Sequence, residues 1–267
     1  MKKVIQMIAL ALILALVTLS VGVAAEPFRV GMECDYAPFN WTQADPSDMA
    51  VPIENGRYAD GYDVQIARLI AEGLGRELVI VRIDWDGLPL AVMSGTIDAI
   101  IAGMSATPER ALTIDFTELY YESDLVVVVR KDSPYADAQT LADLEGARIT
   151  GQLNTTHYDV VDQIPGVNKQ TAMDGFPVMV VALNAGAIDG YVSERPGAVS
   201  AAVANPGLSY VSFAEGQGFD VPPERIAVGL RQGSDLLEAI NAVLATLDEE
   251  ARERTMEGAV SRQPLSE

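Results

Sequence analysis

The residues best suited to bind a ligand lie in one short run, Gly103-Met104-Ser105-Ala106-Thr107-Pro108-Glu109-Arg110, which follows an apolar segment. Thr107 is a favourable N-cap and Pro108 a favourable first helical residue, so the pattern predicts a helix that opens here with Arg110 in its first turn. The helix dipole disfavours a cation at that end, so Arg110 needs an anionic partner. A protein carboxylate or the carboxylate of a bound ligand would serve, because a guanidinium binds a carboxylate through two parallel hydrogen bonds.

This run resembles the ligand-binding motif of the amino-acid-binding proteins of ABC importers, family 3 of the bacterial solute-binding proteins. Further segments resemble the same family in the same order: 30–39, 61–64, 85–88, 94–100, 144–146, 155–156, 188–190 and 193–196. The resemblance implies an α/β, two-lobed periplasmic-binding-protein fold of type 2. Each lobe would be a mixed sheet flanked by helices, the lobes would be joined by a two-strand hinge, and an amino acid would bind between them for delivery to a membrane permease.

The elements that must position these residues follow the alternation of β-branched runs and helical patterns that is typical of parallel sheets covered by helices. A helix ending at Gly75 is predicted from the apolar residues between 64 and 74. Residues 44–57 read as a surface loop. Strands are predicted at 28–32, 77–83, 99–102, 125–130, 147–150, 190–193 and 225–231, and further helices at 158–163, 177–185, 235–247 and 248–259. No internal repeat is visible.

The N-terminus predicts export. Lys2 and Lys3 precede an apolar run, and Val23-Ala24-Ala25 provides small residues for cleavage, so residues 1–25 read as a signal peptide and the product as periplasmic. An uncleaved leader that anchors the chain in the membrane is the alternative. The family resemblance then implies lobe 1 at 26–123 and 226–267, and lobe 2 at 124–225.

Composition narrows the partners. The 267 residues carry a formal net charge of -20, which argues against nucleic acid or an anionic membrane surface. With one cysteine, Cys34, no internal disulfide forms, and no Cys/His spacing suggests a metal. We expect a monomer with no metal and no cofactor.

The resemblance also implies the roles of nine ligand-binding residues. Arg110, Ser105 and the backbone of Gly103 would hold the ligand carboxylate from lobe 1, and Thr155 and Thr156 from lobe 2. The remaining four are Glu194 for the ammonium, Tyr36 and Trp85 as aromatic walls, and Glu33 for the ligand side chain, where it favours polar or cationic ligands.

Each role has a structural alternative. Glu194 could pair with Arg195, Trp85 could be core, and Glu33 could face solvent. The single histidine, His157, is expected on the surface or in packing. Asn154 replaces a glycine of the family, and because Asn tolerates left-handed backbone angles the turn is expected to survive.

Sequence features do not favour an enzyme. No nucleophile elbow, phosphate loop or Cys–His pair is present, so no catalytic residue is predicted. Two alternatives to a transport protein stay open: an exported dehydratase of the prephenate or arogenate type on the same fold, and an amino-acid sensor that partners a membrane receptor.

Overall fold

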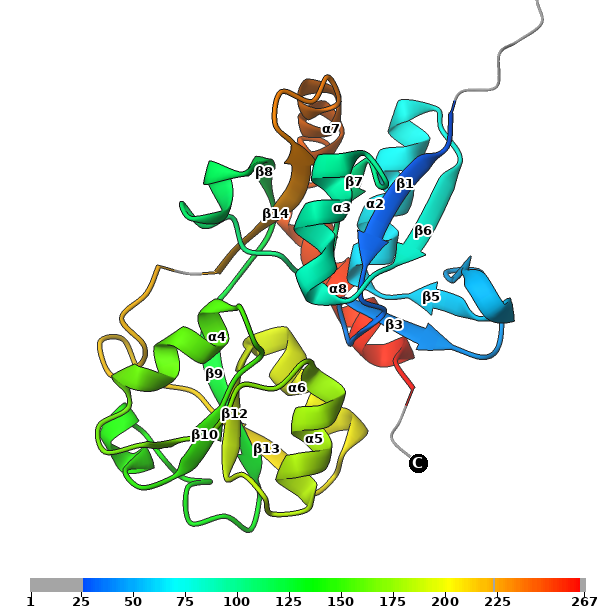
Figure 1. Cartoon of the computed structure of the whole chain (residues 1–267). Coiled ribbons are helices and arrows are strands. Elements are labelled where there is room, and N and C mark those ends of the chain that lie inside the picture. The colour runs from blue at the N-terminus through cyan, green and yellow to red at the C-terminus, as the bar shows by residue number, and fades with distance from the viewer. Residues whose placement is uncertain (1–25, 223, 265–267) are drawn as a thin grey trace, which may run out of the picture.

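Two five-stranded sheets form the centres of two lobes in the computed structural model, which describes residues 26–222 and 224–264 (Figure 1). The first sheet runs in the order β6 (Leu78–Arg82), β1 (Phe28–Met32), β7 (Ala99–Ile100), β14 (Glu224–Arg231) and β8 (Ile114–Ser123). The second runs in the order β11 (Asn168–Lys169), β10 (Arg148–Thr150), β12 (Gly190–Glu194), β9 (Leu125–Arg130) and β13 (Leu208–Val211). In each sheet three neighbouring strands are parallel and the other two pair antiparallel.

The chain passes between the sheets at two neighbouring strands. β8 ends at Ser123 and β9 begins at Leu125 in the other sheet, and the chain returns where β14 begins at Glu224. Because β8 and β14 pair antiparallel, the two passages lie side by side, as Figure 1 shows.

Helices cover both sheets. In the first lobe these are α2 (Tyr62–Leu74), α3 (Leu88–Ser94), α7 (Leu237–Leu244) and α8 (Glu249–Arg262), and in the second α4 (Thr156–Asp159), α5 (Phe176–Asn184) and α6 (Arg195–Ala204). The predicted end of α2 is confirmed, since Gly75 caps it with a φ of 64°. Asp248 caps α8 by accepting a hydrogen bond from the amide of Ala251.

Two local predictions are wrong. The helix expected to open at Thr107 is only a 3-10 turn, η3 (Arg110–Leu112), because β8 starts at Ile114 and leaves no room for a longer helix. The expected loop at 44–57 contains β4 (Val51–Pro52) and the 3-10 turn η1 (Glu54–Gly56). β4 completes a small sheet with β2 (Asp35–Tyr36), β3 (Asn40–Gln43) and β5 (Tyr58–Asp60).

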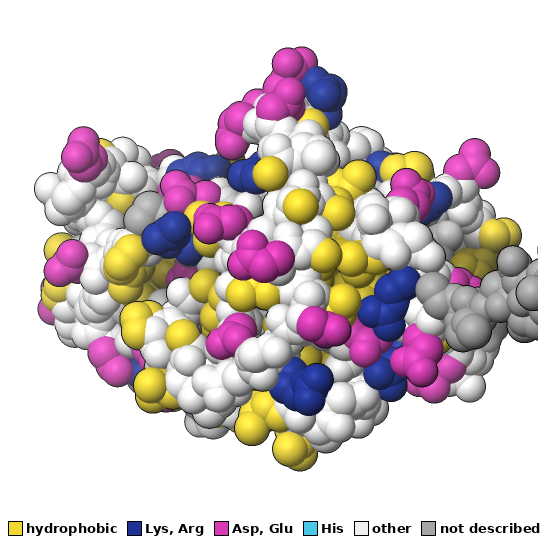
Figure 2. All heavy atoms as spheres, turned by 90° about the horizontal axis from the view of Figure 1, so that it is seen from above, with side chains coloured by type: hydrophobic (Ala, Val, Ile, Leu, Met, Phe, Trp, Pro, Cys, Tyr) yellow, Lys and Arg dark blue, Asp and Glu magenta, His cyan; other side chains and the backbone are white. Residues whose placement is uncertain are grey.

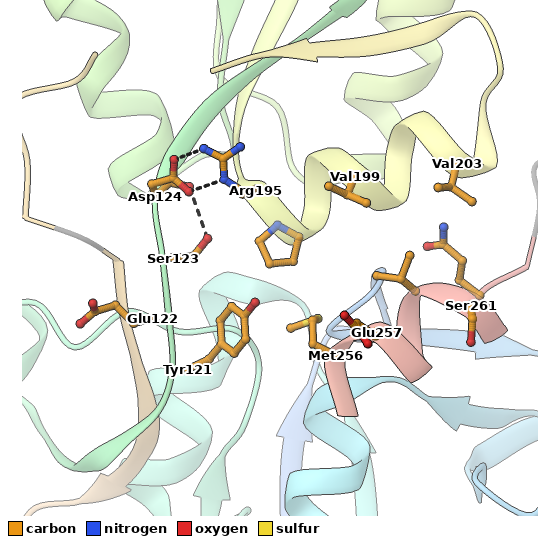
Figure 3. Close-up of a pocket in the computed structure, with 13 residues that line it drawn as sticks. Tyr121, Glu122, Ser123, Asp124, Arg195, Val199, Val203, Met256, Glu257 and Ser261 are labelled. Carbon is orange, nitrogen blue, oxygen red and sulfur yellow. Dashed lines mark hydrogen bonds and ion pairs between the residues drawn. The ribbon is translucent and has the colours of Figure 1, made fainter. Parts of the chain in front are cut away.

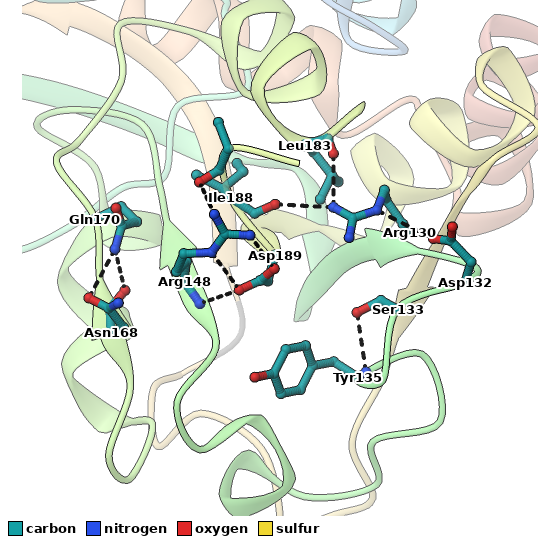
Figure 4. A network of polar contacts seen from close by, with 11 residues as sticks. Arg130, Asp132, Ser133, Tyr135, Arg148, Asn168, Gln170, Leu183, Ile188 and Asp189 are labelled. Carbon is teal, nitrogen blue, oxygen red and sulfur yellow. Dashed lines mark hydrogen bonds and ion pairs between the residues drawn. The ribbon is translucent and has the colours of Figure 1, made fainter. Parts of the chain in front are cut away.

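Each lobe has an equivalent Arg–Asp ion pair that ties its parallel strands together. In lobe 2, Asp189 accepts hydrogen bonds from the backbone and the guanidinium of Arg148, at 2.9 and 2.7 Å (Figure 4). In lobe 1, Asp98 accepts from the backbone and guanidinium of Arg29, both at 2.8 Å. The lobes thus share a structural repeat that the sequence hides, apart from the similar strings at 95–99 and 186–190.

On the face that Figure 2 shows, acidic side chains are distributed over the surface, with basic and apolar groups between them. Within the described residues, no helix combines the length and the apolar character needed to cross a membrane. The predicted signal peptide at 1–25 lies outside the described residues.

Candidate functional site

One small cavity between the lobes collects eight of the nine predicted ligand-binding residues. Lobe 1 contributes Tyr36, Trp85, Gly103, Ser105 and Arg110, and lobe 2 contributes Gln152, Thr155, Thr156, His157 and Glu194, while Ala102 and Glu224 complete the lining. The lobes are closed on each other, and the remaining volume is about 10 Å³, room for about one water molecule. A ligand must therefore replace contacts that these side chains make with one another.

Arg110 is a cation whose hydrogen bonds all go to neutral groups in the described structure. Its Nη1 donates to the carbonyl of Ser105 at 2.9 Å, its Nη2 donates to the carbonyl of Asn154 at 3.4 Å, and its guanidinium lies 5.1 Å from the ring centre of Trp85. Among the described residues, no carboxylate lies within 4 Å of this guanidinium. Burial of the guanidinium lowers the pKa of Arg110. A ligand carboxylate could form the direct, two-hydrogen-bond ion pair that Arg110 does not make with a protein carboxylate in the described structure.

Ser105 is attached to the strand that crosses between the lobes. The amide of Ala106 donates to the carbonyl of Arg225 at 2.8 Å, and the amide of Ala227 donates to Met104 at 3.1 Å, so the segment 104–106 runs beside β14. The hydroxyl of Ser105 donates to the carboxylate of Glu224.

Gly103 contributes differently from the prediction. Its amide donates to the hydroxyl of Tyr120 at 3.1 Å, within lobe 1, instead of facing a ligand carboxylate. Its φ of 62° and its closeness to the ring of Tyr36 explain the glycine, because an added Cβ would come within 3.2 Å of that ring. Gly103 therefore shapes the cavity rather than donating into it.

A buried polar network holds both edges of the site in lobe 1. The carboxylate of Asp63 accepts from the hydroxyl of Tyr120 and from the side-chain amide of Asn40, both at 2.8 Å. Asn40 in turn accepts from the amide of Cys34 at 2.7 Å. Burial raises the pKa of Asp63 to about 6. The network links the turn at Cys34, which carries Glu33 and Tyr36, to the turn at Gly103.

Glu194 lies at the end of β12, fully inside the cleft. Its carboxyl group accepts from the hydroxyl of Tyr36 in the opposite lobe, and its Oε1 lies 3.1 Å from Nε2 of His157. Burial raises the pKa of Glu194 well above its usual range. The alternative pairing with Arg195 does not occur, because that guanidinium pairs with Asp124 at 2.7 Å. An ammonium group beside Glu194 would find a strong acceptor.

Glu33 is buried between the lobes, so the expectation that it might face solvent is wrong. Its Oε1 accepts from the side-chain amide of Gln152 at 2.9 Å, whereas its Oε2 is buried without a hydrogen-bond partner among the described residues. Burial and the nearby Asp35 raise its pKa to about 8. It lines an adjoining cavity of about 430 Å³ whose other acidic residues are Asp35, Asp84, Asp86 and Asp174. A cationic side chain fits that environment.

The turn at Asn154 connects the lobes. Asn154 has a φ of 57°, so the predicted left-handed conformation is confirmed. Its carbonyl accepts from Nε1 of Trp85 at 3.3 Å, and its side chain donates to Asp86 at 2.9 Å. Trp85 is therefore a wall of the cleft and not core. The replacement of glycine by asparagine has added a hydrogen bond across the cleft.

The two threonines after Asn154 differ. The hydroxyl of Thr155 donates to the carbonyl of Gln152 at 2.7 Å and so stabilises the turn. The side chain of Thr156 lies near the carboxylate of Glu224 and lowers the pKa of that group. Of this pair, Thr156 is the one whose side chain interacts with an anionic group.

Sequence reasoning missed three residues of this site. His157, expected on the surface or in packing, is buried and contacts Glu194; its position directly after Thr155-Thr156 was the available signal. Burial lowers its pKa to about 3. Gln152 and Glu224 carried no signal, because only closure of the lobes brings them to the cavity.

A separate, larger cavity of about 690 Å³ lies behind the lobe crossings (Figure 3). Tyr121 and Asp124 line it from the crossing, Val199 from α6 and Met256 from α8. None of the nine predicted site residues lines it. Its lining combines apolar side chains such as Val199, Val203 and Met256 with polar and charged ones such as Asp124 and Arg195.

The fold and this two-sided cleft define a solute-binding protein. Residues 28–257 match the family of bacterial extracellular solute-binding proteins, family 3, and the chain belongs to that family. It is an extracytoplasmic, non-enzymatic amino-acid-binding protein of the kind that serves ABC transporters, and the dehydratase alternative is set aside.

Individual relatives narrow the comparison. The ABC transporter arginine-binding protein 1 of Escherichia coli is 30% identical over 256 residues, covering 92% of this chain and 93% of that protein. A probable histidine-binding protein of Campylobacter jejuni is 32% identical, covering 80% and 76%. An amino acid ABC transporter substrate-binding protein from Streptococcus pneumoniae bound to L-arginine has a TM-score of 0.76 at 30% identity, covering 88% of this chain and 94% of that one.

Proposed function

We propose that this protein captures a cationic L-amino acid of the arginine and lysine kind between its lobes and delivers it to the permease of an ABC importer. The observation that carries the proposal is that Arg110 and Glu194 enter one cleft from opposite lobes, with Glu33 beyond them. These groups match the carboxylate, the ammonium and a positively charged side chain of one ligand molecule.

The charges support a cationic ligand over a neutral or acidic one. The unpartnered Oε2 of Glu33 is a buried acceptor, and its neighbours in the adjoining cavity are carboxylates. A guanidinium or ammonium would pair with Glu33, whereas the side-chain carboxylate of glutamate would be repelled. The arginine-bound relative is consistent with this choice.

We further propose that the mature protein is an exported monomer, with lobe 1 at 26–123 and 226–267 and lobe 2 at 124–225. In the proposed mechanism, ligand binding shifts the lobes toward closure, and the closed pair forms the surface that a permease recognises. Arg110, Ser105 and Thr156 would hold the carboxylate, Glu194 the ammonium, and Tyr36 and Trp85 the apolar part of the ligand, while Thr155 and Gly103 shape the walls.

A thermal-shift screen of refolded, ligand-free protein tests the ligand class, because a ligand that binds only the native state raises the melting temperature. The informative pair is arginine and citrulline, which have nearly the same shape and differ in side-chain charge. Arginine is expected to give the larger shift, and Glu33→Gln should narrow the difference. Equal shifts with the two ligands, or a shift with glutamate alone, would contradict a cationic ligand.

A further inference from the structure

Glu224 brings a carboxylate of the protein itself into the place expected for the carboxylate of the ligand. It is the first residue of β14, where the chain returns to lobe 1, and its side chain is buried. The hydroxyl of Ser105 in lobe 1 donates to it, and the side chain of Thr156 in lobe 2 lies near it and lowers its pKa. Arg110 adds a favourable charge interaction from the same cavity.

These three partners are among the four side chains predicted to hold the ligand carboxylate, the fourth being that of Thr155. Each hydroxyl has one proton to donate, so a hydrogen bond given to Glu224 is not available to a second carboxylate. Two ionised carboxylates that share these donors would also repel each other across a buried cavity. The carboxylate of an amino acid and that of Glu224 therefore exclude each other from this position.

We propose that Glu224 acts as an internal competitor of the ligand carboxylate and thereby sets the affinity and selectivity of the cleft. The inference rests on the proposed function. An incoming amino acid displaces Glu224 from Ser105 and Thr156, and this displacement weakens its binding. A ligand that lacks the carboxylate leaves Glu224 in place.

The charge balance of the cleft gives the same preference. Glu194 and Glu224 line the same cavity as Arg110, and the charge of Glu224 raises the pKa of Glu194. A ligand with additional positive charge is favoured beside these acidic groups, whereas each carboxylate brought in adds repulsion. Neutralising Glu224 should thus favour ligands with a carboxylate specifically.

Calorimetric titration with arginine and with agmatine, which is arginine without its carboxylate, tests the proposal on the intact mature protein. Glu224→Gln keeps the size and the acceptor oxygen but removes the charge. We expect it to lower the Kd of arginine about tenfold and to leave the Kd of agmatine unchanged or raised, because like-charge repulsion is removed only for arginine. Glu122→Gln is the matched control, since Glu122 is an exposed glutamate of the neighbouring strand β8 and pairs in register with Arg225. It should change neither value.

The ratio of the two dissociation constants separates the outcomes. Weaker arginine binding in Glu224→Gln, or an equal change for both ligands, would overturn the competition while leaving the proposed function intact, provided that the unmodified protein binds arginine. Failure of the unmodified protein and of the variant to bind either ligand would overturn both proposals. The melting temperature of the ligand-free variant establishes that it is folded.

Discussion

Oε1 of Glu194 and Nε2 of His157 lie 3.1 Å apart in the interior of the cleft. Burial raises the pKa of Glu194 well above its usual range and lowers that of His157 to about 3. Burial therefore disfavours the charged form of both groups, and His157 is neutral beside Glu194. An ammonium brought against Glu194 would favour its ionised form, and binding would then release a proton.

Proton release on binding is the first prediction. Glu33, with a pKa of about 8, is mainly protonated at pH 7, and burial raises the pKa of Glu194 well above its usual range, whereas a cationic ligand binds the ionised forms of both groups. Titrations in two buffers with different ionisation heats should report net proton release, and affinity should rise as pH increases from 6 to 8. Glu33→Gln should reduce the release. An affinity that is flat over this range would contradict the assignment.

The stability of the ligand-free protein should change with pH in the opposite direction. Folding raises the pKa of Glu33 from about 4.5 to about 8, so its contribution is present at low pH and is lost as the pH rises through 8. His157 is neutral in the folded chain and mostly neutral in the unfolded chain above pH 7, so it adds only a small slope of the opposite sign there. The melting temperature is thus expected to fall between pH 7 and 8, and less steeply in Glu33→Gln.

Removal of either charged anchor should weaken ligand binding strongly. Arg110→Ala and Glu194→Ala are each expected to cost about 2 kcal/mol or more in binding free energy, because the loss of one partner leaves a buried charge on the ligand unpaired. Arg195→Ala is the control, since Arg195 pairs with the half-exposed Asp124 away from the cavity. Calorimetry with the best ligand of the screen measures all three. Near-normal ligand affinity in either anchor variant would show that the substituted residue does not bind the ligand.

The asparagine that replaces glycine at position 154 should stabilise the closed lobes. Asn154→Gly keeps the left-handed backbone but loses the hydrogen bond to Asp86, so we expect binding weaker by about 0.5 kcal/mol with an unchanged fold. Asn55→Gly is the matched control, because Asn55 has a φ of 61° in an exposed turn. Unaltered affinity in Asn154→Gly would show that closure does not depend on this bond.

Gly61 should be essential to lobe 1. Its φ is 137°, and an added Cβ would overlap the backbone of Phe39, next to the turn that carries Tyr36. Gly61→Ala is expected to lower the free energy of unfolding by about 2 kcal/mol or more, measured by urea titration. Gly56→Ala, also at positive φ but with open space around it, should cost only about 1 kcal/mol. Similar losses of unfolding free energy in both variants would show that the positive φ, and not the overlap with Phe39, causes the effect at Gly61.

The sequence predicts the elements whose buried residues can be recognised from the spacing of apolar residues within the element itself. The buried strand β9 and helix α2 with its terminal Gly75 are examples. β8 was not predicted, because it mixes aromatic and acidic residues and is held by pairing with β14, about a hundred residues later. The helix expected at Thr107 failed because favourable capping residues cannot extend a helix into the start of a strand.

For the site, the motif residues from the two lobes do meet in one cavity. Arg110 and Glu194 are charged residues within recognisable family motifs, so they can be selected from the sequence. Glu224 and Gln152 acquire a role only from the closed arrangement of the lobes, which depends on the sum of many contacts between them. His157 lies between these cases, since its place beside Thr156 is visible but its burial is not.

The backbone hydrogen bonds that join segment 104–106 to β14 have a consequence for the time a cargo molecule stays bound. In the proposed function, a ligand held by Ser105 lies beside the strand that carries the chain across to lobe 2. If the cleft opens by bending of that strand, the same movement shifts Ser105, and the ligand loses this contact as the cleft opens. The lifetime of the loaded protein would then depend on how often the cleft opens, and this lifetime limits the time in which a permease can bind it.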